Sequence, residues 1–123
     1  MEQDLDLAAV SDFLLGFDNF ERLSQGSYAL VRQDGKVGLV CISRLQIIVP
    51  VEFDSVSLLF EGPYALVGSG RNHGLYFLEA PDLLLELEYS FIRHVVGPLF
   101  RVQQGSSRWG LFNAEDGTLR WKE

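Results

Sequence analysis

The sequence matches itself at a constant spacing of 36 residues, without a gap. Three glycines follow this spacing, each followed by a leucine, and two sets of aromatic residues follow it as well. The glycines are Gly38, Gly74 and Gly110, and the aromatic sets are Phe17, Phe53 and Tyr89, and Tyr28, Tyr64 and Phe100. Self-similarity at a period of this size is typical of proteins built from repeated structural units. The sequence therefore predicts three copies of one unit, residues 17–52, 53–88 and 89–123, after an N-terminal cap over residues 1–16.

Alternating apolar and polar residues within each copy favour short antiparallel strands. In the first copy two such runs flank Asp34-Gly35, a strong hairpin signal because both central residues of a type I′ turn need positive φ. Residues 47–53 form a third run, and a fourth short strand is expected over 54–60 and 90–96. We therefore expect an all-β fold of three antiparallel meanders stacked as a twisted array. A closed pseudo-threefold barrel or trefoil-like form is the alternative.

The recurring aromatic residues on the first strand of each copy, Tyr28, Tyr64 and Phe100, are expected to face the core. Residues two apart on a strand share a face, and the residues two further along are also apolar. On the opposite face, the last copy carries Arg101 and Gln103 where the earlier copies are apolar. A solvated outer face is typical of the terminal copy of an array, so residues 89–123 are interpreted as a capping copy.

Gly38, Gly74 and Gly110 lie inside predicted strands, where glycine is normally unfavourable. A glycine that recurs there needs a geometric cause. We expect the aromatic ring of the preceding strand to lie across each one, with a β-bulge as the alternative. Either way the glycines are predicted to be structural.

The N-terminal cap, residues 1–16, begins with acidic residues that interrupt its apolar ones. A secretory signal would need a positive start and an unbroken apolar run, and no stretch approaches the ~18 apolar residues of a membrane span. We expect a soluble, cytoplasmic protein. The 36-residue offset places Phe13 over Val49 and Leu15 over Val51, which favours a strand in the cap; a short helix over residues 4–10 is the alternative.

The 123 residues are expected to form a single domain. The net charge of −7 is unevenly spread: −4 in residues 1–16, zero in the first copy, −5 in the second and +2 in the third. An acidic middle copy repels phosphate backbones, so nucleic acid is not expected as a partner. The same charge would steer a basic protein towards the chain.

In its motifs the chain resembles the WG repeats, also called KWG repeats, of bacterial proteins. Phe17-Asp18 and Phe53-Asp54 match the start of that repeat, and Trp109-Gly110 is its naming dipeptide. The segments Gly26 to Val31 and Gly62 to Val67 match the strand entry, and Val49-Pro50 matches the end. The tryptophan is absent before Gly38 and Gly74. The resemblance implies a β-repeat scaffold used for interaction, with no catalytic residues.

Few residues are candidates for chemistry. Four acids of the second copy, Glu79, Asp82, Glu86 and Glu88, are interpreted as a solvated face or as a negative patch for a basic partner. His73 and His94 lie at unrelated positions of different copies, so a metal site, which needs several ligands in fixed geometry, is not expected. Cys41, the only cysteine, cannot form an intramolecular disulfide and is interpreted as a packing residue. We expect no cofactor and no enzymatic activity.

The function expected from these observations is a non-catalytic protein-binding module, for example an immunity-type inhibitor of a basic bacterial protein. A carbohydrate- or cell-wall-binding role is the alternative, with Trp109 and Trp121 as candidate stacking residues. The open edges of a stacked array also allow homo-oligomers, because unpaired strand edges can pair with a second copy.

Overall fold

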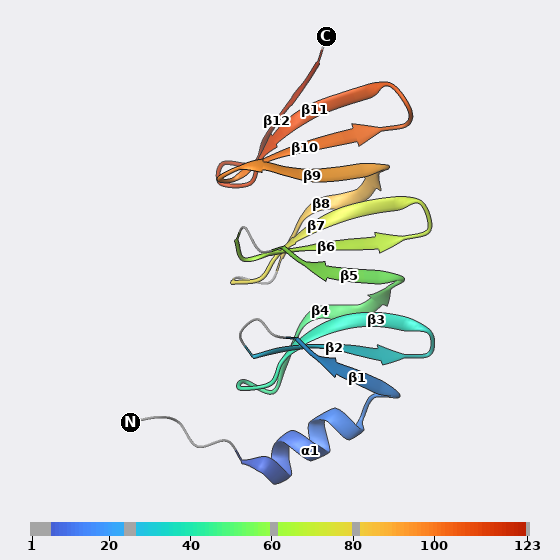
Figure 1. Ribbon diagram of the computed structural model, residues 1–123, viewed down its shortest axis with the longest axis vertical. Helices are drawn as coiled ribbons and strands as arrows, with labels where there is room; N and C mark the ends of the chain where they lie inside the picture. The colour runs from blue at the N-terminus through green and yellow to red at the C-terminus, as the bar shows by residue number, and fades with distance from the viewer. Residues whose placement is uncertain (1–5, 24–26, 60–61, 80–81, 123) are drawn as a thin grey trace. The chain divides into compact units, whose positions relative to one another are not determined.

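The computed structural model describes residues 6–23, 27–59, 62–79 and 82–122 (Figure 1). Within these residues the chain forms one helix, α1 (Leu7–Leu15), and three four-stranded antiparallel sheets. The first sheet contains β1 (Asn19–Arg22), β2 (Tyr28–Gln33), β3 (Lys36–Cys41) and β4 (Gln46–Phe53). The second contains β5 (Ser55–Leu58), β6 (Tyr64–Ser69), β7 (Asn72–Phe77) and β8 (Asp82–Tyr89). The third contains β9 (Phe91–Val96), β10 (Leu99–Gln104), β11 (Arg108–Asn113) and β12 (Thr118–Trp121).

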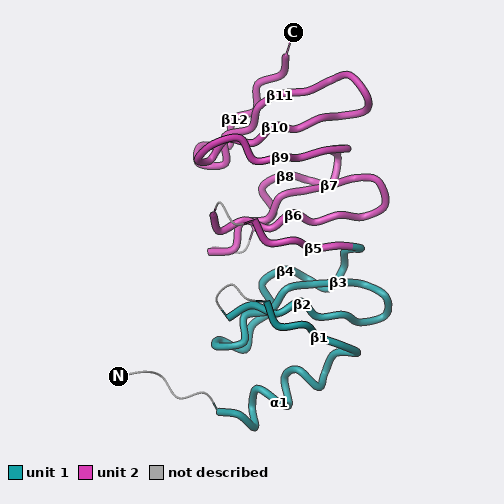
Figure 2. Tube along the Cα trace, viewed as in Figure 1, with its two compact units in different colours: residues 1–54 teal, residues 55–123 magenta. Residues whose placement is uncertain are grey.

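The all-β fold class is confirmed. Each sheet is a meander in chain order, and among the described residues none of the three closes into a barrel. The short fourth strands expected over residues 54–60 and 90–96 are present as β5 and β9. By their contacts the residues divide into two compact units, residues 1–54 and residues 55–123 (Figure 2). The interpretation of the chain as a single domain stays a prediction.

The strand expected in the N-terminal cap is wrong, because residues 7–15 form the helix α1. The side chain of Asp6 caps the helix by accepting hydrogen bonds from the backbone N–H groups of Ala8 and Ala9, at 3.1 and 3.2 Å. A carboxylate at this position satisfies N–H groups that have no partner within the helix. Phe13 and Leu14 of this helix pack against the first sheet, whereas Leu15 is 81% exposed.

Unit 1 has a small core between α1 and the first sheet. The fully buried residues are Ala29, Val31 and Val40, and the partly buried residues Phe13, Leu14, Phe17, Ile42 and Val51 pack against them. Phe13 and Phe17 meet edge to face, with ring centroids 5.7 Å apart. The β2–β3 hairpin turns at Asp34 and Gly35, whose φ angles of 54° and 79° confirm the predicted type I′ turn.

The second sheet repeats the strand register of the first at an offset of 36 residues. Leu39 pairs with Val49 in the first sheet, and Leu75 pairs with Leu85 in the second. In both sheets the register shifts on either side of that leucine, so β4 and β8 carry β-bulges at corresponding places. A bulge bends the strand that contains it, so the third and fourth strands of the two sheets have the same shape.

The recurring glycines share one environment, which is the backbone of the following strand. A Cβ atom added at each glycine would lie 2.5–2.6 Å from a carbonyl oxygen: Val49 O at Gly38, Leu85 O at Gly74 and Arg120 O at Gly110. Real Cβ atoms do not approach an oxygen this closely, so these positions admit no side chain without a shift of the backbone. The predicted cause, a ring of the preceding strand, is wrong; at Gly38 and Gly74 the alternative, a bulge, is present.

The third sheet differs from the other two by a shift of one residue in β10. The β10–β11 turn has three residues, 105–107, whereas the β2–β3 and β6–β7 turns have two. Phe100 therefore lies opposite Phe112, the place that Ala65 takes opposite Tyr76 in the second sheet. A register shift between β9 and β10 at residues 99 and 100 compensates for the extra turn residue.

This shift changes which residues correspond between copies. A slip of one residue moves a side chain to the other face of its strand. Phe100 therefore does not occupy the structural position of Tyr28 and Tyr64, and the prediction that these three residues are equivalent is wrong. The buried face is formed in all three sheets by the same structural positions, which are Ala29, Val31, Ala65, Val67, Phe100 and Val102. Tyr28 and Tyr64 lie on the other face and are half-buried, and Tyr64 packs against the core of unit 2 from that face.

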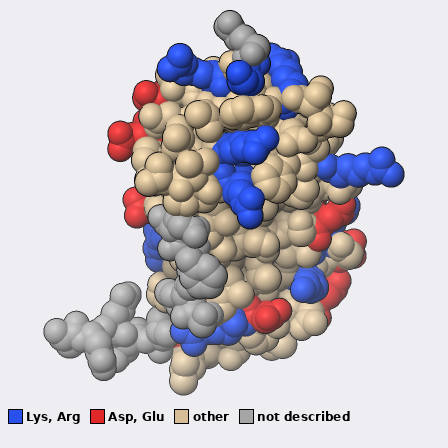
Figure 3. Space-filling model, turned by 45° about the horizontal axis from the view of Figure 1, so that its top comes forward, with Lys and Arg blue, Asp and Glu red and all other residues tan. Residues whose placement is uncertain are grey.

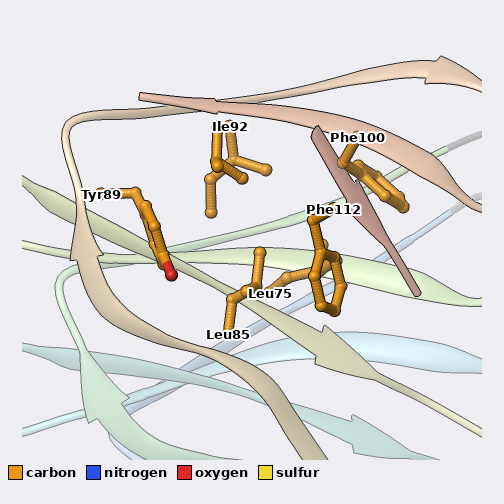
Figure 4. Close-up of a cluster of buried hydrophobic side chains, with 7 residues drawn as sticks. Leu75, Leu85, Tyr89, Ile92, Phe100 and Phe112 are labelled. Atoms are coloured by element: carbon orange, nitrogen blue, oxygen red, sulfur yellow. The ribbon is translucent and has the colours of Figure 1, made fainter. Parts of the chain in front are cut away.

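Unit 2 has a larger core that joins its two sheets. The buried members are Leu75, Leu85, Tyr89, Ile92, Phe100, Val102 and Phe112. Figure 4 shows labelled members of this cluster, contributed by β7 to β11, pointing towards one another. The partly buried Tyr64 belongs to the same cluster and meets Phe100 edge to face, with centroids 5.2 Å apart.

Some predictions fall on residues outside those described. Among them are residues 1–5 of the N-terminal cap, Gly26 at the strand entry of the first copy, and residue 60 at the end of the strand expected over 54–60. Among the described residues, no helix has both the length and the apolar character needed to cross a membrane.

Candidate functional site

The four acids singled out in the sequence lie on β8 and on the turn that precedes it, and we call Glu79, Asp82, Glu86 and Glu88 the acidic segment. All four side chains are exposed. Among the described residues β8 pairs only with β7, so it is an edge strand of the second sheet. Along a strand, Asp82 and Glu88 are about 20 Å apart at ~3.3 Å per residue, so the segment spreads over the length of β8.

The acidic segment has few partners within the protein. Among the described residues, none of its four carboxylates forms an ion pair, and Glu88 accepts one long hydrogen bond from the side chain of Gln104, at 3.5 Å. The apolar neighbours of these acids point inward, with Leu85 buried and Leu87 half-buried. Exposed carboxylates outside ion pairs are available for charge complementarity with a partner.

Glu79 also lines a pocket of about 380 Å³ in unit 2. The apolar part of its wall comes from Pro63, Leu84 and Ala114, and the aromatic part from Tyr64 and Phe77. The second carboxylate is Glu115, which stands 36 residues after Glu79. The pocket thus combines two aromatic rings with two exposed acids, contributed by corresponding turns of the second and third sheets.

The aromatic rings and the turns around this pocket are well fixed. The Tyr64 and Phe77 centroids are 5.8 Å apart and the rings are tilted by 44°. The turn that carries Glu115 is held by its backbone N–H, which donates to Asn113 Oδ1 at 2.9 Å. Asp116 accepts hydrogen bonds from the backbone and hydroxyl of Thr118, which hold the pKa of that carboxyl below its ordinary value.

The two carboxylates act on Tyr64. Burial raises the pKa of the Tyr64 hydroxyl above its ordinary value of 10.0, and the charges of Glu115 and Glu79 raise it further. A like charge disfavours the ionised phenol when it is close enough to be felt. Glu79 and Glu115 therefore create a negative potential at the aromatic wall of the pocket.

The two tryptophans proposed for carbohydrate stacking have guanidinium groups over their rings. Arg101 lies 4.6 Å from the Trp109 centroid, and Arg108 lies 3.9 Å from the Trp121 centroid. Tyr89 stacks on Trp121 with centroids 6.4 Å apart and an interplanar angle of 27°. Figure 3 shows basic side chains gathered near the C-terminal end of the chain. A sugar would have to compete with these contacts for the ring faces.

The histidines and the cysteine lie apart from one another. His94 donates from Nε2 to the carbonyl oxygen of Gly97 at 2.9 Å and helps to form the β9–β10 turn. His73 is half-buried in β7, and Nδ1 of its ring has no hydrogen-bond partner among the described residues. Among all the residues that the structure describes, no three His, Cys, Asp or Glu side chains are grouped so as to hold a metal ion.

Cys41 is buried at the end of β3. Burial raises the pKa of its thiol, but hydrogen bonds with Ser43 and Arg44 and the charge of Arg44 outweigh burial, so the pKa lies below its ordinary value of 9.0. The distance from Sγ to Ser43 Oγ is 3.4 Å. The sequence interpretation did not identify Ser43 and Arg44 as neighbours that lower the pKa of the Cys41 thiol.

Sequence reasoning also missed the pocket, since it named Glu79 but not Tyr64, Phe77 or Glu115 as binding residues. The signal that was available is the recurrence of an acid at the same step of the repeat, in Glu79 and Glu115. The repeat spacing does not reveal the aromatic wall of the pocket, because it is the pairing of β6 and β7 that brings Tyr64 and Phe77 together. No protein-family model matches this chain, and a search of curated proteins finds no similar sequence.

Proposed function

We propose that this chain is a non-catalytic protein-binding module that recognises a basic protein surface through the acidic segment. The observation that carries the proposal is the exposure of all four carboxylates, which form no ion pair within the described residues. Such an arrangement does little for stability and leaves the charge free for complementarity with a partner. An immunity-type inhibitor of a basic bacterial protein, acting in the cytoplasm, is the form of this proposal that best fits the size and charge of the chain.

The resemblance to WG repeats supports this proposal, because those repeats are read as interaction scaffolds. The edge position of β8 supports it as well, since a partner can approach an edge strand from the side. The carbohydrate-binding alternative gains no support from Trp109 and Trp121, because one face of each ring already has a guanidinium group over it, that of Arg101 or Arg108. Self-association through sheet edges stays a prediction.

The test is affinity capture with three forms of the full chain. The wild type is compared with Asp82→Asn/Glu86→Gln/Glu88→Gln, which removes three charges from the acidic segment. A matched control, Asp12→Asn/Glu21→Gln/Glu52→Gln, removes three exposed charges from unit 1. We expect a basic protein to be retained by the wild type and the control, lost from the acidic-segment variant, and released as salt is raised, because salt screens exposed charges.

The captured protein is then purified and titrated against the same three forms to measure Kd. Equal affinity for the acidic-segment variant and the control would contradict the proposal. Retention that does not respond to salt would contradict it too, because recognition would then not be electrostatic.

A further inference from the structure

We propose that the pocket lined by Tyr64, Phe77, Glu79 and Glu115 binds the guanidinium group of an arginine side chain. This inference rests on the proposed function and specifies which group of a basic partner is recognised. It adds a site that lies partly outside the acidic segment, because Glu115 belongs to the third sheet's β11–β12 turn.

The size and walls of the pocket fit one side chain. Its volume of about 380 Å³ lies at the low end of the range for ligand sites in proteins. Pro63, Leu84 and Ala114 offer an apolar surface to an aliphatic stem. Long basic side chains bury such stems against apolar surface while their charged ends reach polar groups.

The aromatic and acidic groups determine the charge and shape of the ligand. A cation placed over an aromatic face is attracted by the negative face of the ring, and Tyr64 and Phe77 both contribute rings to this wall. Glu79 and Glu115 add two negative charges whose joint effect already reaches the Tyr64 hydroxyl. Within the described residues, neither carboxylate has a cation partner. An anion would be repelled by the two carboxylates, and a neutral ligand would gain no charge attraction from them.

Arginine fits better than lysine because its guanidinium is planar, is weakly hydrated, and forms paired hydrogen bonds with carboxylates while stacking on rings. The same unit already makes this kind of contact twice. Arg101 lies over Trp109 and Arg108 lies over Trp121, at 4.6 and 3.9 Å from the ring centroids. The pocket supplies aromatic rings for such a contact, and no arginine of this chain is among the residues that line it.

The experiment is an NMR titration of the full chain with a capped Gly-Arg-Gly peptide, followed through the ring resonances of Tyr64 and Phe77. A Gly-citrulline-Gly peptide of nearly equal shape is the neutral control, and Gly-Lys-Gly is the point-charge control. We expect the arginine peptide to shift both rings in a saturable way, the lysine peptide to bind more weakly, and the citrulline peptide to cause no saturable shift. Equal binding of the arginine and citrulline peptides, or of arginine and lysine, would overturn the proposal.

Variants locate the site. Glu115→Gln, which leaves the acidic segment intact, should weaken arginine binding about threefold, and Glu79→Gln/Glu115→Gln about tenfold, as expected for partly exposed charge-assisted contacts. The matched control Glu21→Gln/Glu52→Gln removes two exposed charges from unit 1 and should leave the affinity within twofold. Amide spectra that overlay away from the pocket show that each variant is folded.

The outcomes separate this inference from the proposed function. If Glu115→Gln binds the arginine peptide as the wild type does, the pocket is not the site and this inference fails. The contribution of Asp82, Glu86 and Glu88 to capture of a basic protein is measured with variants that leave all the pocket residues unchanged. The proposed function can therefore hold when this inference fails. Conversely, a pocket that binds the arginine peptide in a chain that captures no basic protein would contradict the proposed function alone.

Discussion

Phe100 lies directly opposite Phe112 across β10 and β11. The Phe100 side chain is completely buried, and its ring meets that of Tyr64 edge to face, with centroids 5.2 Å apart and an interplanar angle of 79°. Tyr64 in turn lines the candidate pocket. The packing of the third sheet on the second is therefore linked to the aromatic wall of the proposed binding site.

Replacing Phe100 by alanine should lower the free energy of unfolding by about 3–5 kcal/mol, because it leaves a large cavity between two packed sheets. Denaturant unfolding followed by tryptophan fluorescence measures the change. The control is Phe20→Ala in β1, whose side chain is 47% exposed and whose loss should cost less than about 1 kcal/mol. Similar losses at the two positions would contradict the assignment of Phe100 to the core.

Alanine at Gly74 should destabilise unit 2 by about 1–3 kcal/mol, because its Cβ would lie 2.5 Å from the carbonyl oxygen of Leu85. The same substitution at Gly38 and Gly110 should cost a similar amount. Gly16→Ala is the control, since Gly16 has a φ of −72°, which any residue adopts. Thermal unfolding of the four variants checks the order, and an unchanged Tm for Gly74→Ala would show that the strands do not approach as closely as described.

Removing the cap of α1 by Asp6→Ala should lower the stability of unit 1 by about 1 kcal/mol, the usual effect of losing an N-cap side chain. The amide protons of Ala8 and Ala9, which donate to Asp6, should exchange faster with solvent. Asp12→Ala lies within the same helix and caps nothing; it should leave stability unchanged or raise it slightly, because alanine has the higher helix propensity. Unchanged exchange at Ala8 and Ala9 in Asp6→Ala would count against the cap.

The ionisation of Tyr64 should report on both carboxylates of the pocket. Burial and then Glu115 and Glu79 raise the pKa of Tyr64 above 10.0, so Glu79→Gln/Glu115→Gln should lower the pKa of this residue. The pH titration of its ring carbon resonance by NMR measures this pKa. Tyr89 is the internal control: burial raises its pKa first and Glu88 adds to the effect, so its titration should not move. A Tyr64 pKa unchanged by the double substitution would place the carboxylates elsewhere.

The sign of the pH effect follows from linkage. Because the folded-state pKa of Tyr64 is higher than the unfolded one, its contribution to stability is fully present below about pH 10 and is lost as pH rises through the folded-state pKa. Tyr64→Phe should therefore show a smaller loss of stability on going to strongly alkaline pH than the wild type. An identical alkaline profile for both would contradict the raised pKa.

The sequence predicts the local elements of this fold well, because their signals are local. Asp34-Gly35 specifies a type I′ turn by its backbone preferences, and the turn forms as expected. The 36-residue spacing also predicts corresponding strands in the first two sheets, and a bulge was the alternative explanation for their recurring glycines. These features depend on residues that are close in the chain, and a two-residue hairpin turn and a bulged strand both recur in the second sheet.

Three features were missed for physical reasons. The slip of β10 depends on a three-residue turn compensated by a register shift at Leu99, and an alignment without gaps hides two changes that cancel. A helix in the N-terminal cap was only the alternative, over residues 4–10, because the 36-residue offset placed Phe13 and Leu15 over a strand, although Asp6 was present as a capping signal. The candidate pocket joins side chains from two sheets, and only the pairing of strands brings Tyr64 beside Phe77.

The most direct test of the account is to map where a basic ligand binds on the whole chain. A peptide of alternating arginine and glycine is titrated into the protein, and the amide resonances of the protein are followed by two-dimensional NMR. The account predicts saturable shifts along the acidic segment and at Ala114 and Glu115, with those at Asp12, Glu21 and Glu52 unchanged. Shifts of equal size at the exposed acids of both units, or saturation confined to unit 1, would contradict it.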